Sequence, residues 1–306
     1  MAELCVIFNA AAGRRRAARR LNRLRRNWGA RAEFWPTSHA GHADELAYQA
    51  AKAGFPTVVA AGGDGTVHEV ANGLLRAGRP EVVFGVAPIG SANDYAHSLN
   101  HEAGPDPFAV RAVDVGVVRD PAGRQRYFVC CLGLGLNGAV TLESTRIKRL
   151  QGLALYGLAT LRALWYRYAC PVMALTVDGR QTDPAPTLML SVLLGRREGN
   201  FVMAPEARLD DGLFDYVRAG CLSRAEVLRY LPRIALAGPP KSHPKVTFGR
   251  CQTLGLCSEA PLTVHIDGEF FSRPEDDVRS LDIRLLPRAL RVRLFPVDAS
   301  PLAPPG

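Results

Sequence analysis

Apolar and polar positions alternate in blocks along the first third of the chain. Short apolar runs, several of them β-branched, are separated by longer segments in which apolar residues recur at helical spacing. The pattern predicts strands at residues 4–8, 32–35, 56–61 and 82–88, and helices from residue 14 to about 27, at 41–53 and at 66–75. Strands that alternate with helices are typical of a parallel, doubly wound sheet.

After residue 114 the rhythm changes to many short strand-like runs separated by Gly and Pro. These runs lie at residues 127–132, 172–177, 188–194, 213–218, 245–248, 262–266 and 281–285, with helical stretches at 150–168 and 223–236. We interpret residues 150–168 as a core helix; a cover over a ligand site is the alternative. The pattern predicts an α/β domain of residues 1–115, a β-rich domain of residues 116–285 and a tail of residues 299–306. A last strand, about 286–298, can return to the first domain.

The composition is that of a globular protein with room for two cores: 306 residues, of which 47% are apolar and 22% charged. No apolar run reaches the ~18 residues of a membrane span, and the first residues lack the features of a secretory signal. We therefore expect a soluble, cytoplasmic protein. Seven cysteines at irregular spacings favour reduced core cysteines over disulfides or zinc ligands. His39 and His42 have a permissive spacing, but we expect no further ligand beside them.

Much of the net charge of +9 comes from one segment, residues 13–28, which contains eight arginines. A basic surface favours anionic partners such as nucleic acid, acidic lipid headgroups or nucleotide phosphates. A solvated helix face is the alternative. No nucleic-acid recognition module accompanies the segment.

The loop at residues 62–65, Gly-Gly-Asp-Gly, stands between a predicted strand and a predicted helix. Glycines let a ligand approach the backbone closely, and the helix N-terminus that follows favours phosphate. Thr66 can cap that helix or bond a phosphate, and Glu69 and Asn72 follow on the same helical face. The loop is neither a Walker A loop nor the dinucleotide GxGxxG motif. An ordinary tight turn is the alternative.

Five segments, in order, resemble motifs of the diacylglycerol kinase catalytic family, which includes sphingosine and ceramide kinases and small bacterial lipid kinases. They lie at residues 9–13 (NAAAG), 62–66 (GGDGT), 88–96 (PIGSANDYA), 204–215 (APEARLDDGLFD) and 265–269 (HIDGE). The resemblance spans nearly the whole chain. Two positions depart from it: Ala10 stands where proline is usual, and Cys130 stands where asparagine is usual.

The resemblance implies an ATP-dependent kinase that phosphorylates a lipid hydroxyl such as that of diacylglycerol. It implies that the first domain binds the nucleotide and that the second is a β-sandwich offering an apolar acceptor site, with the reaction in the cleft between them. The residues implied to bind ATP are Asn9, Gly13, Thr37, Gly62, Gly63, Asp64, Gly65, Thr66, Glu69, Ser91, Asn93 and Asp94.

The family likeness also singles out carboxylates for catalysis. Glu269 is the candidate base for the acceptor hydroxyl, and Asp267 is its rival; on the local pattern alone, Asp-Gly is a common hairpin turn. Asp64 and Asp94 suit phosphate-binding loops if Mg²⁺ stands between them and the nucleotide. A turn aspartate and a helix cap are the respective alternatives.

A separate acidic turn at residues 210–212 is implied to hold a structural Mg²⁺. The ligands would be the Asp211 side chain and the backbones of Arg208 and Leu213, and the alternative is a solvated Asp-Asp-Gly turn. The arginine segment could contact ATP through residues 14–16 and anionic headgroups through residues 19–26. The expected location is cytoplasmic, with peripheral and transient contact at an anionic inner membrane surface.

Two other functions remain open. One is a kinase of related fold that acts on a soluble acceptor such as NAD, and the other is a nucleotide-binding protein without activity. The sequence names neither the lipid nor the oligomeric state.

Overall fold

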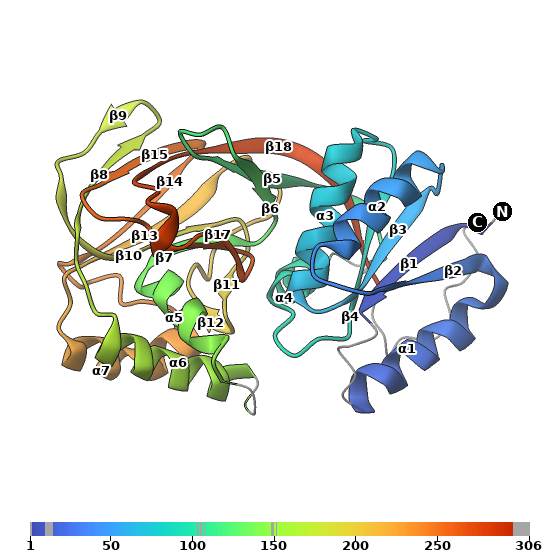
Figure 1. Ribbon diagram of the computed structural model, residues 1–306, viewed down its shortest axis with the longest axis horizontal. Coiled ribbons are helices and arrows are strands. Elements are labelled where there is room, and N and C mark those ends of the chain that lie inside the picture. The colour runs from blue at the N-terminus through green and yellow to red at the C-terminus, as the bar shows by residue number, and fades with distance from the viewer. Residues whose placement is uncertain are drawn as a thin grey trace. The chain divides into compact units, whose positions relative to one another are not determined.

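The computed structural model describes residues 2–9, 15–102, 104, 106, 108–147, 150 and 152–295. The chain divides into two compact units, which are coloured along the chain in Figure 1. Unit 1 comprises Met1–Val113 and Arg288–Gly306, and unit 2 comprises Asp114–Pro287. The sequence predicts the corresponding boundaries after residues 115 and 285.

Unit 1 is built on a parallel sheet in the strand order β18–β4–β3–β1–β2. Its strands are β1 (Leu4–Asn9), β2 (Ala32–Thr37), β3 (Thr57–Gly62), β4 (Val83–Pro88) and the C-terminal part of β18 (Ser280–Leu294). The central strands are covered on both faces, and this is why they read as continuous apolar runs rather than as alternating ones.

Helices cover both faces of this sheet, and Figure 1 shows α1 (Arg15–Trp28) on the side away from α2 (His42–Lys52) and α3 (Asp64–Ala77). Leu24 and Trp28 of α1 pack against β1 and β3. Arg25 places its guanidinium 5.1 Å from the centre of the Phe8 ring, a cation–π contact. The arginine segment thus forms an amphipathic helix, whose apolar stripe packs on the sheet and whose arginines lie on the other side.

The remaining elements of unit 1 are short. They are the 3₁₀ helix η1 (Gly29–Arg31), α4 (Asp94–His101) and the first residues of β5 (Arg111–Arg119). Helices α2 and α3 pack closely at Gly73, where a Cβ atom would lie 2.2 Å from the carbonyl oxygen of Asp44. Any side chain at position 73 would therefore push the two helices apart.

Unit 2 is an antiparallel β-sandwich. One layer has the order β17–β16–β7–β10–β13–β14, and the other contains β9, β8, β15 and the first part of β18. Strand β10 joins both layers, since its first residues pair with β8 and its later ones with β7 and β13. The bounds of these strands, and of β6, are as follows: β6 (Gln125–Phe128), β7 (Cys131–Gly135), β8 (Val172–Val177), β9 (Arg180–Gln181), β10 (Ala185–Leu193), β13 (Phe214–Gly220), β14 (Val246–Cys251), β15 (Thr253–Ser258), β16 (Val264–Ile266) and β17 (Glu269–Ser272).

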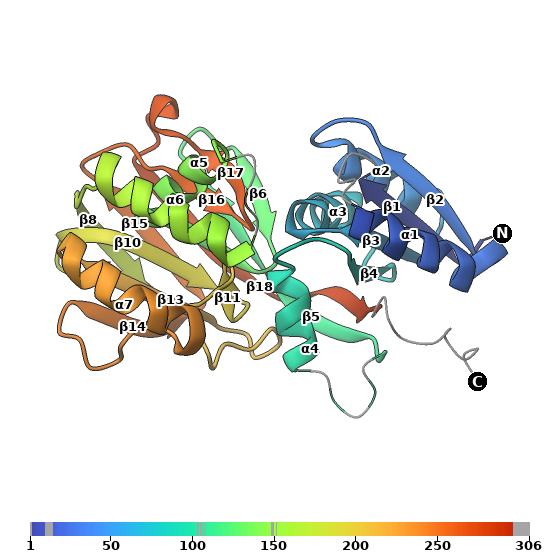
Figure 2. The same ribbon diagram turned by 90° about the horizontal axis from the view of Figure 1, so that it is seen from below.

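Three helices lie against the layer that contains β10 and β13. They are α5 (Leu136–Ser144), which the sequence pattern missed, α6 (Gly152–Tyr166) and α7 (Arg224–Ala237). Both Figure 1 and Figure 2 show α6 and α7 side by side. A hairpin of β11 (Arg197–Glu198) and β12 (Phe201–Val202) and the 3₁₀ helix η2 (Pro274–Asp276) complete the unit.

Two expectations from the sequence are wrong in unit 2. Helix α6 is not a core helix, because its buried residues are confined to Ala159, Thr160, Ala163 and Leu164 on one face. Cys170 and Cys221 are not reduced, because they form a disulfide. Their separation of 51 residues hid the pairing, since the two positions meet only after α6 and α7 pack together.

The predicted fold class, an α/β unit followed by a β-sandwich with the last strand returning to the first sheet, is confirmed. Among the described residues, no helix is both long enough and apolar enough to cross a bilayer.

Candidate functional site

The residues predicted to bind a nucleotide gather where the parallel strands of unit 1 end. Asn9 pairs with Thr37 at the ends of β1 and β2, and Gly62 pairs with Pro88 at the ends of β3 and β4. The carboxyl edge of an open α/β sheet is the general place for ligands. The predicted residue Gly13 lies outside the described residues.

Three glycines bring the loops after β3 and β4 into direct backbone contact. The Gly90 N–H donates to the Gly62 carbonyl oxygen at 3.1 Å. A Cβ atom on Gly90 would lie 2.4 Å from the Cα atom of Gly63, and one on Gly62 would lie 2.3 Å from Oγ1 of Thr66. Side chains are therefore excluded at Gly62 and Gly90, and the two loops meet through backbone atoms.

Asp64 fastens these two loops together. Its Oδ2 atom accepts the N–H of Asn93 at 2.8 Å, and its Oδ1 atom accepts the N–H of Tyr95 at 3.4 Å. The carboxylate thus satisfies donors at the start of α4, where negative charge is favoured. Asn93 adopts a positive φ of 54° as the N-cap residue, and its side-chain amide donates to the Gly90 carbonyl. Sequence reasoning considered a local turn for Asp64, whereas its partners lie in the next loop.

Glu69 likewise accepts backbone N–H groups at the start of a helix, in this case α2. Its two carboxylate oxygens accept the N–H groups of Gly41 at 2.9 Å and Ala43 at 3.0 Å. This contact holds the loop that follows Thr37 against α3. Helix α3 itself begins after Gly63 without a side-chain cap. Its first N–H groups therefore suit an anion such as a phosphate.

The remaining predicted residues of this edge surround the same two loops. Gly65 and Thr66 lie in the first turn of α3 and are half-buried. Ser91 is exposed in the loop before α4, and Asp94 is buried as the first residue of that helix.

In unit 2, the turn between β16 and β17 contains the two candidate catalytic carboxylates in different surroundings. Asp267 is buried and has a φ of 51°. Its carboxylate accepts three backbone N–H groups, from Val129, Cys130 and Cys131, each at 2.9 Å. Glu269, at the start of β17, is exposed. Asp267 is therefore built into the fold, and Glu269 faces solvent.

The same contacts explain the unusual residue at position 130. Cys130 serves Asp267 through its backbone N–H, and its side-chain Sγ donates to the carbonyl oxygen of Arg197. The backbone contact does not depend on the side chain, so a cysteine at this position retains it.

Beside this turn lies a buried polar network that sequence reasoning missed. His265 Nε2 lies 2.8 Å from one carboxylate oxygen of Glu198, and Ser191 donates to the other at 2.6 Å. Asn137 in turn donates to Ser191 at 2.7 Å. Gly133 is required opposite them, because a Cβ atom there would lie 2.1 Å from Glu198. Ser191 and His265 are polar residues within apolar strands, and this was the one available signal.

The acidic turn predicted to hold Mg²⁺ is tied together by protein groups. Asp211 accepts the Leu213 N–H at 3.2 Å through Oδ1 and forms an ion pair with Arg250 through Oδ2. The neighbouring Gly212 N–H donates to buried Asp114 at 2.7 Å. A carboxylate and main-chain carbonyls suit a hard cation. They fit one here only if Arg250 leaves Asp211.

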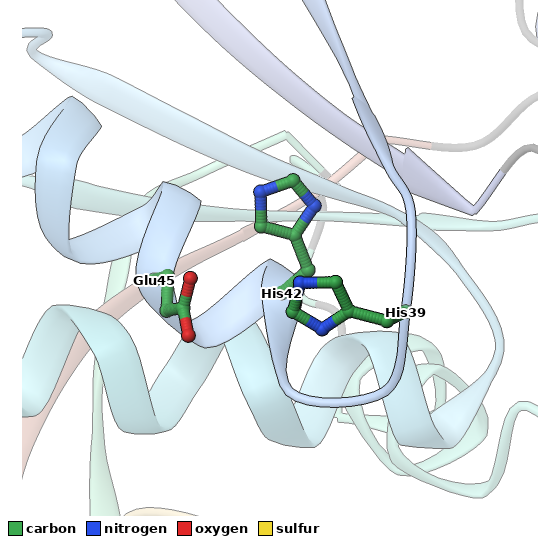
Figure 3. A group of neighbouring side chains, drawn as sticks. All are labelled: His39, His42 and Glu45. Carbon is green, nitrogen blue, oxygen red and sulfur yellow. The ribbon is translucent and has the colours of Figure 1, made fainter.

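A group of three possible metal ligands, His39, His42 and Glu45, follows β2 (Figure 3). The expectation of no further ligand beside the two histidines is wrong, because Glu45 joins them one helical turn on. The Nδ1 atom of His42, however, accepts the Ser38 N–H at 3.0 Å. Coordination through Nε2 would place a proton on Nδ1 and break that bond. A metal ion bound in this way would therefore have to displace the Ser38 contact.

Comparisons with known proteins agree with the two-unit fold. A family model described as diacylglycerol kinase catalytic domain matches residues 3–146, and one described as YegS C-terminal NAD kinase beta sandwich-like domain matches residues 131–294. A diacylglycerol kinase of Staphylococcus carnosus (strain TM300) is 27% identical over 276 residues, which cover 87% of this chain and 88% of that protein. One of Staphylococcus aureus (strain MRSA252) is 27% identical over 278 residues, covering 87% and 85%.

Solved structures share the fold at low identity. A crystal structure of a diacylglycerol kinase from Bacillus anthracis (strain Sterne) has a TM-score of 0.66 at 18% identity, covering 97% of this chain and 98% of that chain. Yeast NADH kinase complexed with NADH has a TM-score of 0.51 at 6% identity, covering 96% and 83%.

Proposed function

The chain belongs to the diacylglycerol kinase catalytic family, and from this premise we propose that it is a kinase that transfers the γ-phosphate of ATP to the hydroxyl of diacylglycerol or a similar lipid. The observation that carries the proposal is the contact of Gly62, Gly63 and Gly90, which leaves bare backbone beside the uncapped start of α3. Such backbone is what a chain of phosphates needs.

We assign the nucleotide to the carboxyl edge of the sheet in unit 1. Thr66 offers a hydroxyl in the first turn of α3, and Ser91 offers one in the loop after β4. Asp64 and Glu69 act on the backbone: each holds a loop in place by accepting two N–H groups. We therefore propose positioning roles for these two carboxylates. Phosphoryl transfer depends on such positioning, because the protein supplies little covalent chemistry.

Glu269 is the proposed base for the acceptor. Asp267 uses its carboxylate oxygens on three backbone donors, whereas Glu269 is exposed at the end of the same turn. The Glu269 carboxylate accepts the proton of the lipid hydroxyl while the hydroxyl oxygen bonds to the γ-phosphorus. The bond from that phosphorus to the bridging oxygen breaks, and ADP leaves.

Mg²⁺ is the proposed metal cofactor. Asp94, buried at the start of α4, is the proposed protein ligand near the nucleotide, and the ion would neutralise charge on the transferred phosphate. A second ion at Asp211 and the backbones of Arg208 and Leu213 requires displacement of Arg250.

The test is transfer of label from γ-labelled ATP to a panel of micellar lipids and to NAD, with and without Mg²⁺. We expect labelled lipid from the wild type and its loss in Glu269→Gln. The matched control is Glu275→Gln, which changes another exposed glutamate of unit 2 and is expected to retain activity. Label on NAD instead of lipid would establish the soluble-acceptor alternative. ATP binding without transfer to any acceptor would leave an inactive nucleotide-binding protein.

A further inference from the structure

The exposed apolar side chains of this protein are concentrated on two helices. Nine large apolar side chains are exposed among the described residues, and all except Val110 and Leu150 belong to α6 or α7. Leu150 lies two residues before the start of α6. Those that form the surface discussed below are Leu153, Leu158, Leu161 and Trp165 on α6, and Leu228 and Leu236 on α7. We call these six residues the α6–α7 face.

The spacing of these residues follows the helices. Leu158, Leu161 and Trp165 recur three and four positions apart and so form one stripe along α6. Leu228 and Leu236 lie two turns apart on α7. Other residues of both helices, such as Ala163 and Val227, share a buried cluster with β10 and β13. The stripe is therefore on the side of α6 that faces away from its own core. Figure 2, seen from below, shows α6 and α7 in front of the strands.

Positive charge accompanies this apolar surface. Helix α7 contains three arginines against one glutamate, and Arg229 and Arg233 are exposed. Beside α6, three guanidiniums converge on the single buried carboxylate of Glu143, at 2.7–3.0 Å. Both helices thus present net positive charge together with leucines and a tryptophan that is 75% exposed. Apolar residues flanked by arginine, with an aromatic ring between, are the chemistry of an interfacial helix on an anionic bilayer.

We propose that the α6–α7 face docks onto the surface of an anionic lipid bilayer. The proposal rests on the proposed function, because a lipid acceptor resides in a bilayer. The apolar side chains enter the headgroup region, and Arg229 and Arg233 meet the lipid phosphates. Exposed apolar surfaces also mark contacts between proteins, and a second copy of the chain is the alternative that the test includes.

The test is sedimentation of the full chain with vesicles of phosphatidylcholine containing phosphatidylglycerol, and with vesicles of phosphatidylcholine alone. Leu161→Ser with Trp165→Ser is expected to weaken binding to the anionic vesicles at least tenfold. Arg229→Gln with Arg233→Gln is expected to weaken it about 30-fold, from about 1 kcal/mol for each arginine. Val110→Ser and Arg180→Gln are the matched controls, since both residues are exposed and lie outside α6 and α7. They should bind like the wild type.

Activity assays separate this proposal from the kinase itself. Transfer to a short-chain diacylglycerol dissolved as monomers should be unchanged in both double variants, and transfer to long-chain diacylglycerol in anionic vesicles should fall with binding. No transfer to the dissolved substrate by the wild type would contradict the proposed function without touching the docking result. Unchanged vesicle binding in both double variants would overturn the docking proposal. The docking proposal would also be overturned if the double variants lost a dimer, measured by sedimentation equilibrium, and kept their vesicle binding.

Discussion

Asp267 and Glu269 lie in the same turn, but we expect their replacement to have different effects. Replacing Asp267 should lower stability, and replacing Glu269 should abolish activity. Asp267→Asn keeps the size of the side chain but removes its charge and replaces one acceptor oxygen by an amide that can only donate. If the Asn oxygen takes the place of Oδ1, two of the three N–H bonds persist as neutral bonds. The third donor, on Val129, then faces another donor.

The cost can be worked from these contacts. A buried donor left without its acceptor costs about 1–3 kcal/mol, and a bond to a charged group is stronger than a neutral one by about 1 kcal/mol. One lost bond and two weakened ones add up to about 3–5 kcal/mol of unfolding free energy. For a domain of this size, that lowers the melting temperature by about 10 °C. Glu269→Gln, at an exposed position, should leave the melting temperature unchanged and abolish lipid phosphorylation.

The assay is thermal and urea unfolding followed by circular dichroism, with phosphoryl transfer measured on the folded variants. An Asp267→Asn variant with the melting temperature and urea midpoint of the wild type would refute this prediction. The prediction is equally refuted if Glu269→Gln is the variant that loses stability. Asp183→Asn is the control, since it alters an exposed aspartate of the same unit and should cost little.

Three further predictions concern unit 2. Replacing Cys170 and Cys221 by serine opens a loop of 51 residues. We expect the free energy of unfolding, measured with urea, to fall by about 4 kcal/mol. An unchanged urea midpoint would contradict the disulfide. Glu143→Gln leaves its arginines without their carboxylate, which we expect to cost about 2 kcal/mol at pH 7 because those arginines are partly exposed. Burial opposes ionisation of Glu143, but the arginine bonds outweigh it and lower its pKa from 4.5. Its contribution is therefore complete above pH 4.5 and is lost as the pH falls through the lower folded-state pKa, so wild type and variant should converge in acid-titrated melts. Arg250→Ala should make the melting temperature rise with millimolar Mg²⁺, whereas the wild type should respond little; equal responses would show that Arg250 does not compete with the ion at Asp211.

Local order was predictable where one element carried the whole signal. The parallel strands of unit 1 are buried on both faces, so their apolar runs stand out between helices. The Gly-Gly-Asp-Gly loop at residues 62–65 was predictable as a strand-to-helix connection because the chain itself orders strand, loop and helix. Helix α5 was missed because it begins within an apolar run that reads equally well as the end of a strand.

Contacts between distant segments were beyond reach for a different reason. Asp64 was known to stand in the loop, but not that it bonds backbone 29 residues away. Glu198 and His265, 67 residues apart, met only when the sandwich closed. Spacing along a chain carries no information about partners that are brought together by packing of separate strands.

The sequence by itself determined the alternation of strands and helices in unit 1 and the β-rich character of unit 2, because both follow from periodicity along the chain. The β-sandwich and the residues assigned to the sheet edge came instead from the resemblance to a kinase family. Only the tertiary structure decided that Asp267 and Glu69 bond to backbone N–H groups of other segments, and that Glu269 is exposed. It also decided that α6 buries one side and exposes leucines on the other. The physical reason is that an apolar helix sequence does not distinguish a side covered by its own core from one left for a partner.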